Sequence, residues 1–309
     1  MKNLDKYHIY SVYFAPRGRE RLLTIGEQIS QRHLSYSDKL IGIVGDAGSG
    51  KSLIIHGMFP GVSLSNDDDG LDPRKIMQIR QNLDRDYHNT TYHLDMRFQM
   101  AFTQMYEIVD FVKDALTHNR RVIIEHFDLL YQYLKINADI MIGIGEEIIV
   151  TRPNLFGPLP KDIYNVVFES LKNRKMTHSA EDLTTLVLMN DYKIPFKVMN
   201  SEVRCGFVLN FNEKPEIDLY ALEEKVQALI DKGLDISYYD ENHIQIGDGD
   251  IIHCTGPRIH VRNTAEIINF KLLKEIKYDH SLNMYALVGV VGDRNIDLEN
   301  LNRIMREDL

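Results

Sequence analysis

The chain has 309 residues, 44% of them hydrophobic and 26% charged, which is enough apolar side chain for two packed domains. Its 45 acidic and 36 basic residues give a net charge of −9, which disfavours a protein that coats nucleic acid with a broad cationic surface. Only two cysteines occur, Cys205 and Cys254, so a disulfide framework is excluded and a reducing, cytoplasmic compartment is favoured. The apolar runs are strand-sized and the first residues lack a secretion signal, so we expect no membrane span.

The first half of the chain alternates short apolar stretches with longer helical patterns. A strand over 8–14 and an amphipathic helix over 17–32 are predicted first, and the apolar stripe of 98–117 predicts a further helix. Five more strands are predicted at 40–44, 62–65, 122–124, 140–144 and 148–150. This alternation predicts an α/β fold with a mostly parallel sheet covered by helices.

The second half has a different pattern, and three prolines within 153–160 place a domain junction near 151–161. Helices are predicted at 162–173, 179–189 and 219–232, and strands at 207–211, 237–239, 244–246, 266–273 and 284–289. We therefore expect an extension over 1–38, an α/β domain over 39–160 and an α+β domain over 161–309.

A glycine-rich segment joins the predicted strand 40–44 to a helical pattern. It reads Gly45, Asp46, Ala47, Gly48, Ser49, Gly50, Lys51, Ser52 and fits the phosphate-loop (Walker A) pattern G-x-x-x-x-G-K-[ST]. Glycines let backbone amides converge on a polyphosphate at the positive end of a helix. Lys51 would then neutralise the outer phosphates and the Ser52 hydroxyl would ligate Mg²⁺. The sequence thus predicts binding of ATP or another nucleoside triphosphate.

Acidic residues follow two of the predicted strands. Asp67 and Asp68 come directly after 62–65, and Glu125 comes directly after 122–124. At these positions one carboxylate could assist Mg²⁺ and another could accept a proton from a substrate hydroxyl. The aspartates could equally belong to a solvated turn.

Residues 39–153 resemble the uridine kinase branch of the P-loop kinases. The similarity lies in Ile41 to Ser52, in the run Leu64 to Asp69 and in the run Arg121 to Leu130. The resemblance implies a catalytic role for Asp67 or Asp68 and for Glu125. Kinases of this branch carry an arginine-rich lid, whereas the corresponding segment 146–153 has one arginine, Arg152.

Ligand-type side chains cluster in the second half. Cys254 and His260 flank a Gly-Pro turn, while His178 and Asp182 are spaced i, i+4 and would share one helix face. Thiolate and imidazole together suit Zn²⁺, and the helical pair could complete a tetrahedral site. Structural roles for these residues remain an alternative.

Residues 176–291 resemble the second additional domain of alanyl-tRNA synthetase, which threonyl-tRNA synthetase and free-standing editing proteins share. The resemblance lies in Thr177 to Leu183, Gly206 to Phe211, His260 to Leu272 and Tyr285 to Gly289. It implies His178, Asp182, Cys254 and His260 as zinc ligands. It also implies a partner in the form of an aminoacyl group or a tRNA 3′ end.

Three functions are compatible with these patterns. The first is an ATP-binding NTPase or small-molecule kinase whose second domain recognises an aminoacyl group or tRNA end. The second is a zinc-dependent aminoacyl-tRNA deacylase regulated by nucleotide, in which the metal activates water or polarises the ester carbonyl. The third is a non-enzymatic nucleotide sensor with structural zinc.

Overall fold

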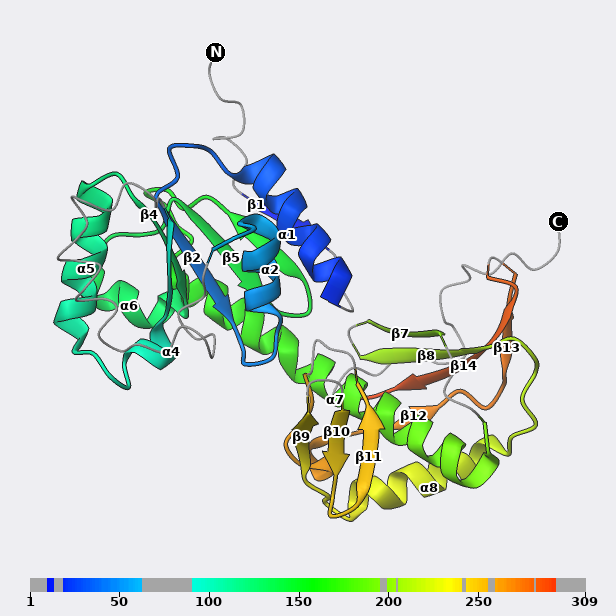
Figure 1. Ribbon diagram of the computed structural model, residues 1–309. Helices are drawn as coiled ribbons and strands as arrows, with labels where there is room; N and C mark the ends of the chain where they lie inside the picture. The colour runs from blue at the N-terminus through cyan, green and yellow to red at the C-terminus, as the bar shows by residue number, and fades with distance from the viewer. Residues whose placement is uncertain are drawn as a thin grey trace. The chain divides into compact units, whose positions relative to one another are not determined.

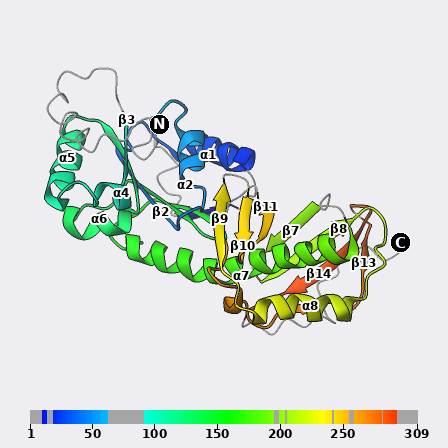
Figure 2. The ribbon, with the colours of Figure 1, turned by 60° about the horizontal axis from the view of Figure 1, so that its bottom comes forward.

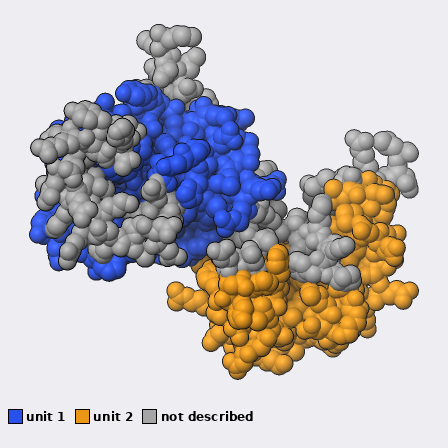
Figure 3. Space-filling model, in the orientation of Figure 1, with its two compact units in different colours: residues 1–169 blue, residues 170–309 orange. Residues whose placement is uncertain are grey.

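The computed structural model describes residues 10–13, 19–62, 91–194, 199–203, 205–240, 243–254, 259–280 and 282–292. The chain forms two compact units, residues 1–169 and residues 170–309 (Figure 3). The expected carboxylates Asp67 and Asp68, and nearly all of the strand expected before them, lie outside the described residues. No helix among the described residues combines the length and apolar composition needed to cross a membrane.

The first unit is built on a six-stranded sheet with the order β1-β6-β5-β2-β4-β3 (Figure 1). Its strands are β1 (Tyr10–Tyr13), β2 (Leu40–Gly45), β3 (Thr91–Asp95), β4 (Arg121–Glu125), β5 (Ile140–Ile144) and β6 (Ile148–Thr151). Strands β3, β4, β2 and β5 run parallel, whereas β6 and β1 are antiparallel to their neighbours. The unit is therefore α/β with a mixed sheet, because β5 and β6 are joined by a tight reversal instead of a crossover helix.

Helices cover both faces of this sheet. They are α1 (Arg19–His33), α2 (Lys51–Met58), α4 (Met96–Gln99), α5 (Met105–Thr117) and α6 (Phe127–Leu134). On one face, Ile41 and Ile43 of β2 belong to a buried cluster with Leu22 of α1 and Ile54 of α2. Gly42 points to the opposite face, where an added Cβ would lie 2.8 Å from the ring of Phe127, so α6 packs directly on the β2 backbone. The unit thus has three layers.

The helix predicted over 98–117 is two helices. Phe102 and Tyr106, which belonged to the predicted apolar stripe, are 57% and 66% exposed, whereas Val112 is buried. The chain turns after α4, and α5 begins anew where the Glu107 carboxylate accepts a hydrogen bond from the Gln104 backbone amide at 3.1 Å. This local cap sets the true helix start.

The two helices predicted at 162–173 and 179–189 form one continuous helix, α7 (Pro160–Tyr192) (Figure 2). No proline or glycine follows Pro160 within it, so nothing in the backbone stops the helix. The boundary between the compact units falls inside α7, after Glu169, rather than at 151–161. Strand β1 and helix α1, expected to form a separate extension, belong to the first unit.

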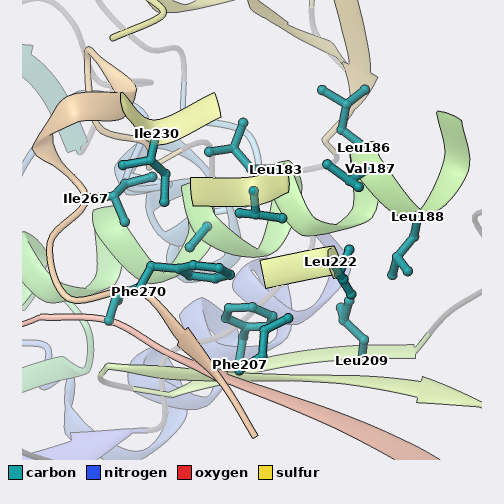
Figure 4. Packing of buried hydrophobic residues seen from close by; sticks show 14 of the residues in the cluster. Leu183, Leu186, Val187, Leu188, Phe207, Leu209, Leu222, Ile230, Ile267 and Phe270 are labelled. Carbon is teal, nitrogen blue, oxygen red and sulfur yellow. The ribbon is translucent and has the colours of Figure 1, made fainter. Parts of the chain in front are cut away.

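The second unit is α+β. Its strands are β7 (Met199–Val203), β8 (Gly206–Phe211), β9 (Ile236–Asp240), β10 (His243–Ile246), β11 (Asp250–His253), β12 (Lys271–Leu272), β13 (Lys277–Asp279) and β14 (Met284–Val290). One sheet has the order β12-β14-β8-β7 with β13 also paired to β14, and the other has the order β11-β10-β9. Between them and the helices α7 and α8 (Leu219–Asp231) lies a core that includes Leu183, Phe207, Leu222 and Phe270 (Figure 4).

The strand predicted over 266–273 is much shorter. Residues Thr264–Glu266 form a 3-10 turn, and only β12 joins the sheet. Asn263 causes this turn, because its side chain accepts a hydrogen bond from the Ala265 amide at 3.0 Å while Glu266 accepts one from the Asn263 amide at 3.0 Å. Such a reciprocal cap gives the backbone of residues 264–266 a local alternative to strand pairing.

Candidate functional site

The segment Gly45–Ser52 runs from the last residue of β2 into the first turn of α2, at the carboxyl end of the parallel strands. Gly48 and Gly50 have φ angles of 73° and 88°, a left-handed conformation that glycine adopts without penalty. A Cβ at Gly50 would lie 2.6 Å from Leu22 Cδ1, so the loop passes tightly over α1. Gly50 has no side chain to cap α2, and the first-turn amides of a helix have no intrahelical partners. The loop therefore presents backbone donors at a helix N-terminus.

Lys51, at the start of α2, is only 7% exposed, and its ammonium makes polar contacts with Asp46 and Glu125. Its Nζ donates a hydrogen bond to the Asp46 carbonyl oxygen at 2.9 Å and lies 3.5 Å from Glu125 Oε2. The ammonium is thus folded back over its own loop. Ser49 Oγ is buried and has no hydrogen-bond partner among the described residues, while Ser52 is half-buried.

Strand register brings two further groups to the lysine. Glu125 at the end of β4 is opposite Ile43 of β2, and His93 of β3 is opposite Ile123 of β4. His93 and Glu125 are therefore diagonal neighbours on the face that α1 and α2 cover. His93 Nε2 lies 3.1 Å from Glu125 Oε1, and both side chains are almost completely buried.

Opposing effects act on the pKa of Glu125. Burial by itself raises the pKa of this carboxyl, but the hydrogen bond with His93 and the charge of Lys51 outweigh burial and lower it. Glu125 is therefore ionised at neutral pH and forms a buried ion pair with Lys51.

His126 follows Glu125 in a left-handed conformation, with φ 55°, and is 4% exposed. Burial lowers the pKa of His126 to about 4, and the nearby charges of Lys51 and Arg97 add to this effect. The ring is consequently neutral at pH 7. A strained backbone beside a buried ion pair is typical of functional sites.

Arg152, the one arginine of the segment 146–153, is not near this loop. Its guanidinium binds the carboxylate of Asp38, which precedes β2, so it lies at the opposite end of the strands from Gly45. Lys51 and Arg97 are the cations whose charges lower the pKa of His126.

A second cluster lies wholly within the second unit. Helix α7 supplies His178 and Asp182, Cys254 follows β11, and His260 comes six positions later. One ligand atom from each of these four residues lies within 4.8 Å of the others. The structure thus gathers all four residues that the sequence singled out as metal ligands.

The spacing of the four donors can be compared with a zinc site. Cys254 Sγ lies 3.7 Å from His178 Nε2 and 3.9 Å from His260 Nε2, and Asp182 Oδ2 lies 3.8 Å from His178 Nε2. Bonds of about 2.0–2.3 Å to a tetrahedral ion separate donors by about 3.3–3.8 Å. His260 Nε2 is closer to Asp182 Oδ2, at 2.8 Å, as expected for a proton between them.

The pKa of His260 reflects its short contact with Asp182. Burial alone lowers the pKa of His260, but hydrogen bonds with Asp182 and Cys254 outweigh it and raise the pKa to about 10. A bound cation would replace that proton. Two imidazoles, a thiol and a carboxylate form a donor set that fits Zn²⁺.

A buried serine supports the cluster. Ser179 Oγ accepts a hydrogen bond from the Val261 amide at 3.1 Å, which fixes the backbone after His260 against α7. The loop 255–258, including Arg258 and the Gly-Pro turn, lies outside the described residues.

Comparison with protein-family models finds no match, and comparison with curated proteins finds none either. The arguments for function therefore rest on the geometry of the two clusters.

Sequence reasoning missed His93 and gave His126 no role. Both carried a signal: His93 interrupts the apolar centre of the run Thr91–Asp95, and His126 directly follows a strand-end glutamate. Neither signal shows which partner the imidazole meets, because that depends on strand order.

Proposed function

We propose that the chain binds a nucleoside triphosphate, ATP in the first instance, together with Mg²⁺ at Gly45–Ser52. The observation that carries the proposal is the position of Lys51, whose ammonium lies over a loop with left-handed Gly48 and Gly50 at the start of α2. Helix N-termini and converging backbone amides bind phosphate groups.

Three side chains of this segment would have distinct parts in the binding. Lys51 would leave the Asp46 carbonyl and neutralise a terminal phosphate, and Ser49 Oγ, buried and unpartnered among the described residues, offers a further hydroxyl. Ser52 would hold Mg²⁺, which would offset the negative charge of the phosphates.

The reaction that fits best is nucleotide hydrolysis or phosphoryl transfer to a small molecule. Glu125 is ionised and lies next to Lys51, where it could orient a nucleophile. Arg152 is committed to Asp38, so charge developing on a transferred phosphoryl group would depend on Lys51 and Mg²⁺. Hydrolysis needs no binding site for a second substrate, because water is the acceptor.

Binding of a fluorescent ATP analogue with Mg²⁺, measured for wild type and Lys51→Ala, tests this function. We expect Lys51→Ala to weaken binding by at least about tenfold, the effect of losing one charge-assisted hydrogen bond. Lys113→Ala, on the exposed side of α5, is the matched control and should bind like wild type. Equal affinity of wild type and Lys51→Ala would contradict the proposal.

A second candidate function rests on the cluster of His178, Asp182, Cys254 and His260. We propose that these residues hold Zn²⁺ and that the second unit recognises an aminoacyl group or tRNA 3′ end. A zinc ion held by all four residues would be a closed site, so Lewis-acid chemistry on an ester would require one of the four ligands to give way to water or to the ester carbonyl. The side chains themselves would bind the ion and exclude bulk water, since Asp182, Cys254 and His260 are nearly inaccessible.

Hydrolysis of mischarged tRNA separates the two functions. Loss of deacylation in Cys254→Ala and His260→Ala, with ATP binding intact, would favour the deacylase. Turnover of ATP that is lost in Lys51→Ala would favour the NTPase or kinase. Binding of nucleotide and zinc with neither turnover leaves a nucleotide sensor with structural zinc.

A further inference from the structure

His93 occupies the centre of a buried strand and contacts a charged residue. Its side chain is fully inaccessible, and Tyr92 and Leu94 beside it are 5% and 2% exposed. A buried imidazole costs free energy unless it is hydrogen-bonded. The hydrogen bond to Glu125 Oε1, at 3.1 Å, offsets part of this cost.

The two oxygens of Glu125 have different partners. Oε1 meets the His93 ring, and Oε2 lies 3.5 Å from Lys51 Nζ. A carboxylate can rotate about its last bond, so a hydrogen bond to one oxygen determines where the other points. His93 thereby orients the oxygen that attracts the lysine.

The lysine has a second fixed contact, with the Asp46 carbonyl oxygen at 2.9 Å. The line from His93 through Glu125 to Lys51 therefore ends on the glycine-rich loop. A change at His93 can alter the direction of the ammonium without touching the loop itself.

We propose that His93 is a positioning residue of the phosphate site: by donating Nε2–H to Glu125, it directs Lys51 toward the loop that receives the nucleotide. The inference rests on the proposed nucleotide binding and deepens it. In this proposal His93 touches neither nucleotide nor metal, and its effect on Lys51 passes through Glu125.

The test is a double-mutant cycle on the affinity for a fluorescent ATP analogue with Mg²⁺. His93→Leu removes the donor at similar volume, and His93→Gln keeps an N–H donor at a similar reach. We expect His93→Leu to weaken binding about tenfold and His93→Gln to stay within about threefold of wild type. In a Glu125→Gln background, which has no carboxylate to orient, His93→Leu should change affinity by less than about twofold.

Thermal unfolding midpoints of all variants check that they are folded. Should His93→Leu fail to fold, His93→Asn takes its place, because its shorter amide cannot reach Glu125 while remaining polar; it should show the same loss. An equal loss for His93→Leu in both backgrounds, or an equal loss for His93→Gln, would overturn the positioning role while leaving nucleotide binding intact. Absence of nucleotide binding by wild type would instead overturn the proposed function, and this inference with it.

Discussion

Arg152 and Asp38, 114 positions apart in the chain, form a two-pronged ion pair in which Nη1–Oδ1 and Nη2–Oδ2 are both 2.7 Å. The guanidinium also donates to the carbonyl oxygen of His33. Burial by itself raises the pKa of Asp38, but the hydrogen bonds from Arg152 and the Ser35 amide outweigh it and lower the pKa. The pair ties the end of β6 to the end of α1 and the start of β2, at the end of β2 opposite the glycine-rich loop.

Arg152→Gln should lower the free energy of unfolding by about 3 kcal/mol, because it leaves Asp38 charged and buried without its partner. Urea denaturation measures this change. Lys225→Gln breaks the exposed pair with Asp191 and should leave the urea midpoint almost unchanged, because solvent screens that pair. Nucleotide affinity of folded Arg152→Gln should remain within about twofold of wild type, and a larger loss would place Arg152 in the nucleotide site.

Gly50→Ala should impair both folding and nucleotide binding. The left-handed φ of 88° costs an alanine about 1 kcal/mol, and the new Cβ would press on Leu22 at 2.6 Å. Gly249→Ala is the control, since a Cβ there meets nothing within 4 Å. Gly50→Ala should have a lower urea midpoint and a lower affinity for ATP than Gly249→Ala. Equal midpoints and affinities would show that neither folding nor nucleotide binding requires the left-handed conformation at Gly50.

Cys254→Ala should remove the bound zinc, whereas Cys205→Ala should retain it. Both thiols are free and buried, but Cys254 alone lies in the four-residue cluster. Metal analysis of protein purified with zinc should give about one ion per chain for wild type and Cys205→Ala. Equal zinc contents in the two variants would exclude the cluster as the binding site.

The pH dependence of stability should change in His126→Asn. The pKa of His126 is about 4 in the folded chain, below the ordinary value of 6.5, so the unfolded chain takes up the proton first as pH falls. This contribution to stability is complete above pH 6.5 and is lost between pH 6.5 and about 4. Asparagine tolerates the left-handed backbone and does not titrate.

Urea denaturation of wild type and His126→Asn at pH 7.5 and pH 5 checks this sign. Wild type should lose more stability on acidification than the variant. Parallel losses in the two proteins would mean that His126 titrates normally in the folded state.

The glycine-rich loop shows what local sequence can predict. Its spacing, with an apolar strand before and a helix after, is local information, and the structure has β2 and α2 at those positions. The i, i+4 spacing of His178 and Asp182 likewise places them on one face of α7. Helix spacing could not place Cys254 and His260 beside this pair, because the contact of Cys254 with His178 joins residues 76 positions apart in the chain.

Helix boundaries were less predictable. The apolar stripe of 98–117 continues through the turn between α4 and α5, and the cap at Gln104 shows where α5 begins. The expected break between 173 and 179 does not exist, because one helix serves two cores, with Ile163 over Gly143 in the first unit and Leu183 in the second.

The amino-acid order alone predicted most strands and several helices, the glycine-rich segment between a strand and a helix, and the residue types suited to a metal, because each depends on neighbours within a turn or two. Only the tertiary structure decided that β3 lies beside β4, and hence that His93 meets Glu125 and Glu125 meets Lys51. It also decided that Arg152 meets Asp38 rather than the loop. The order and register of the strands decide which buried charged residues become neighbours. Order and register in turn depend on how the whole sheet packs.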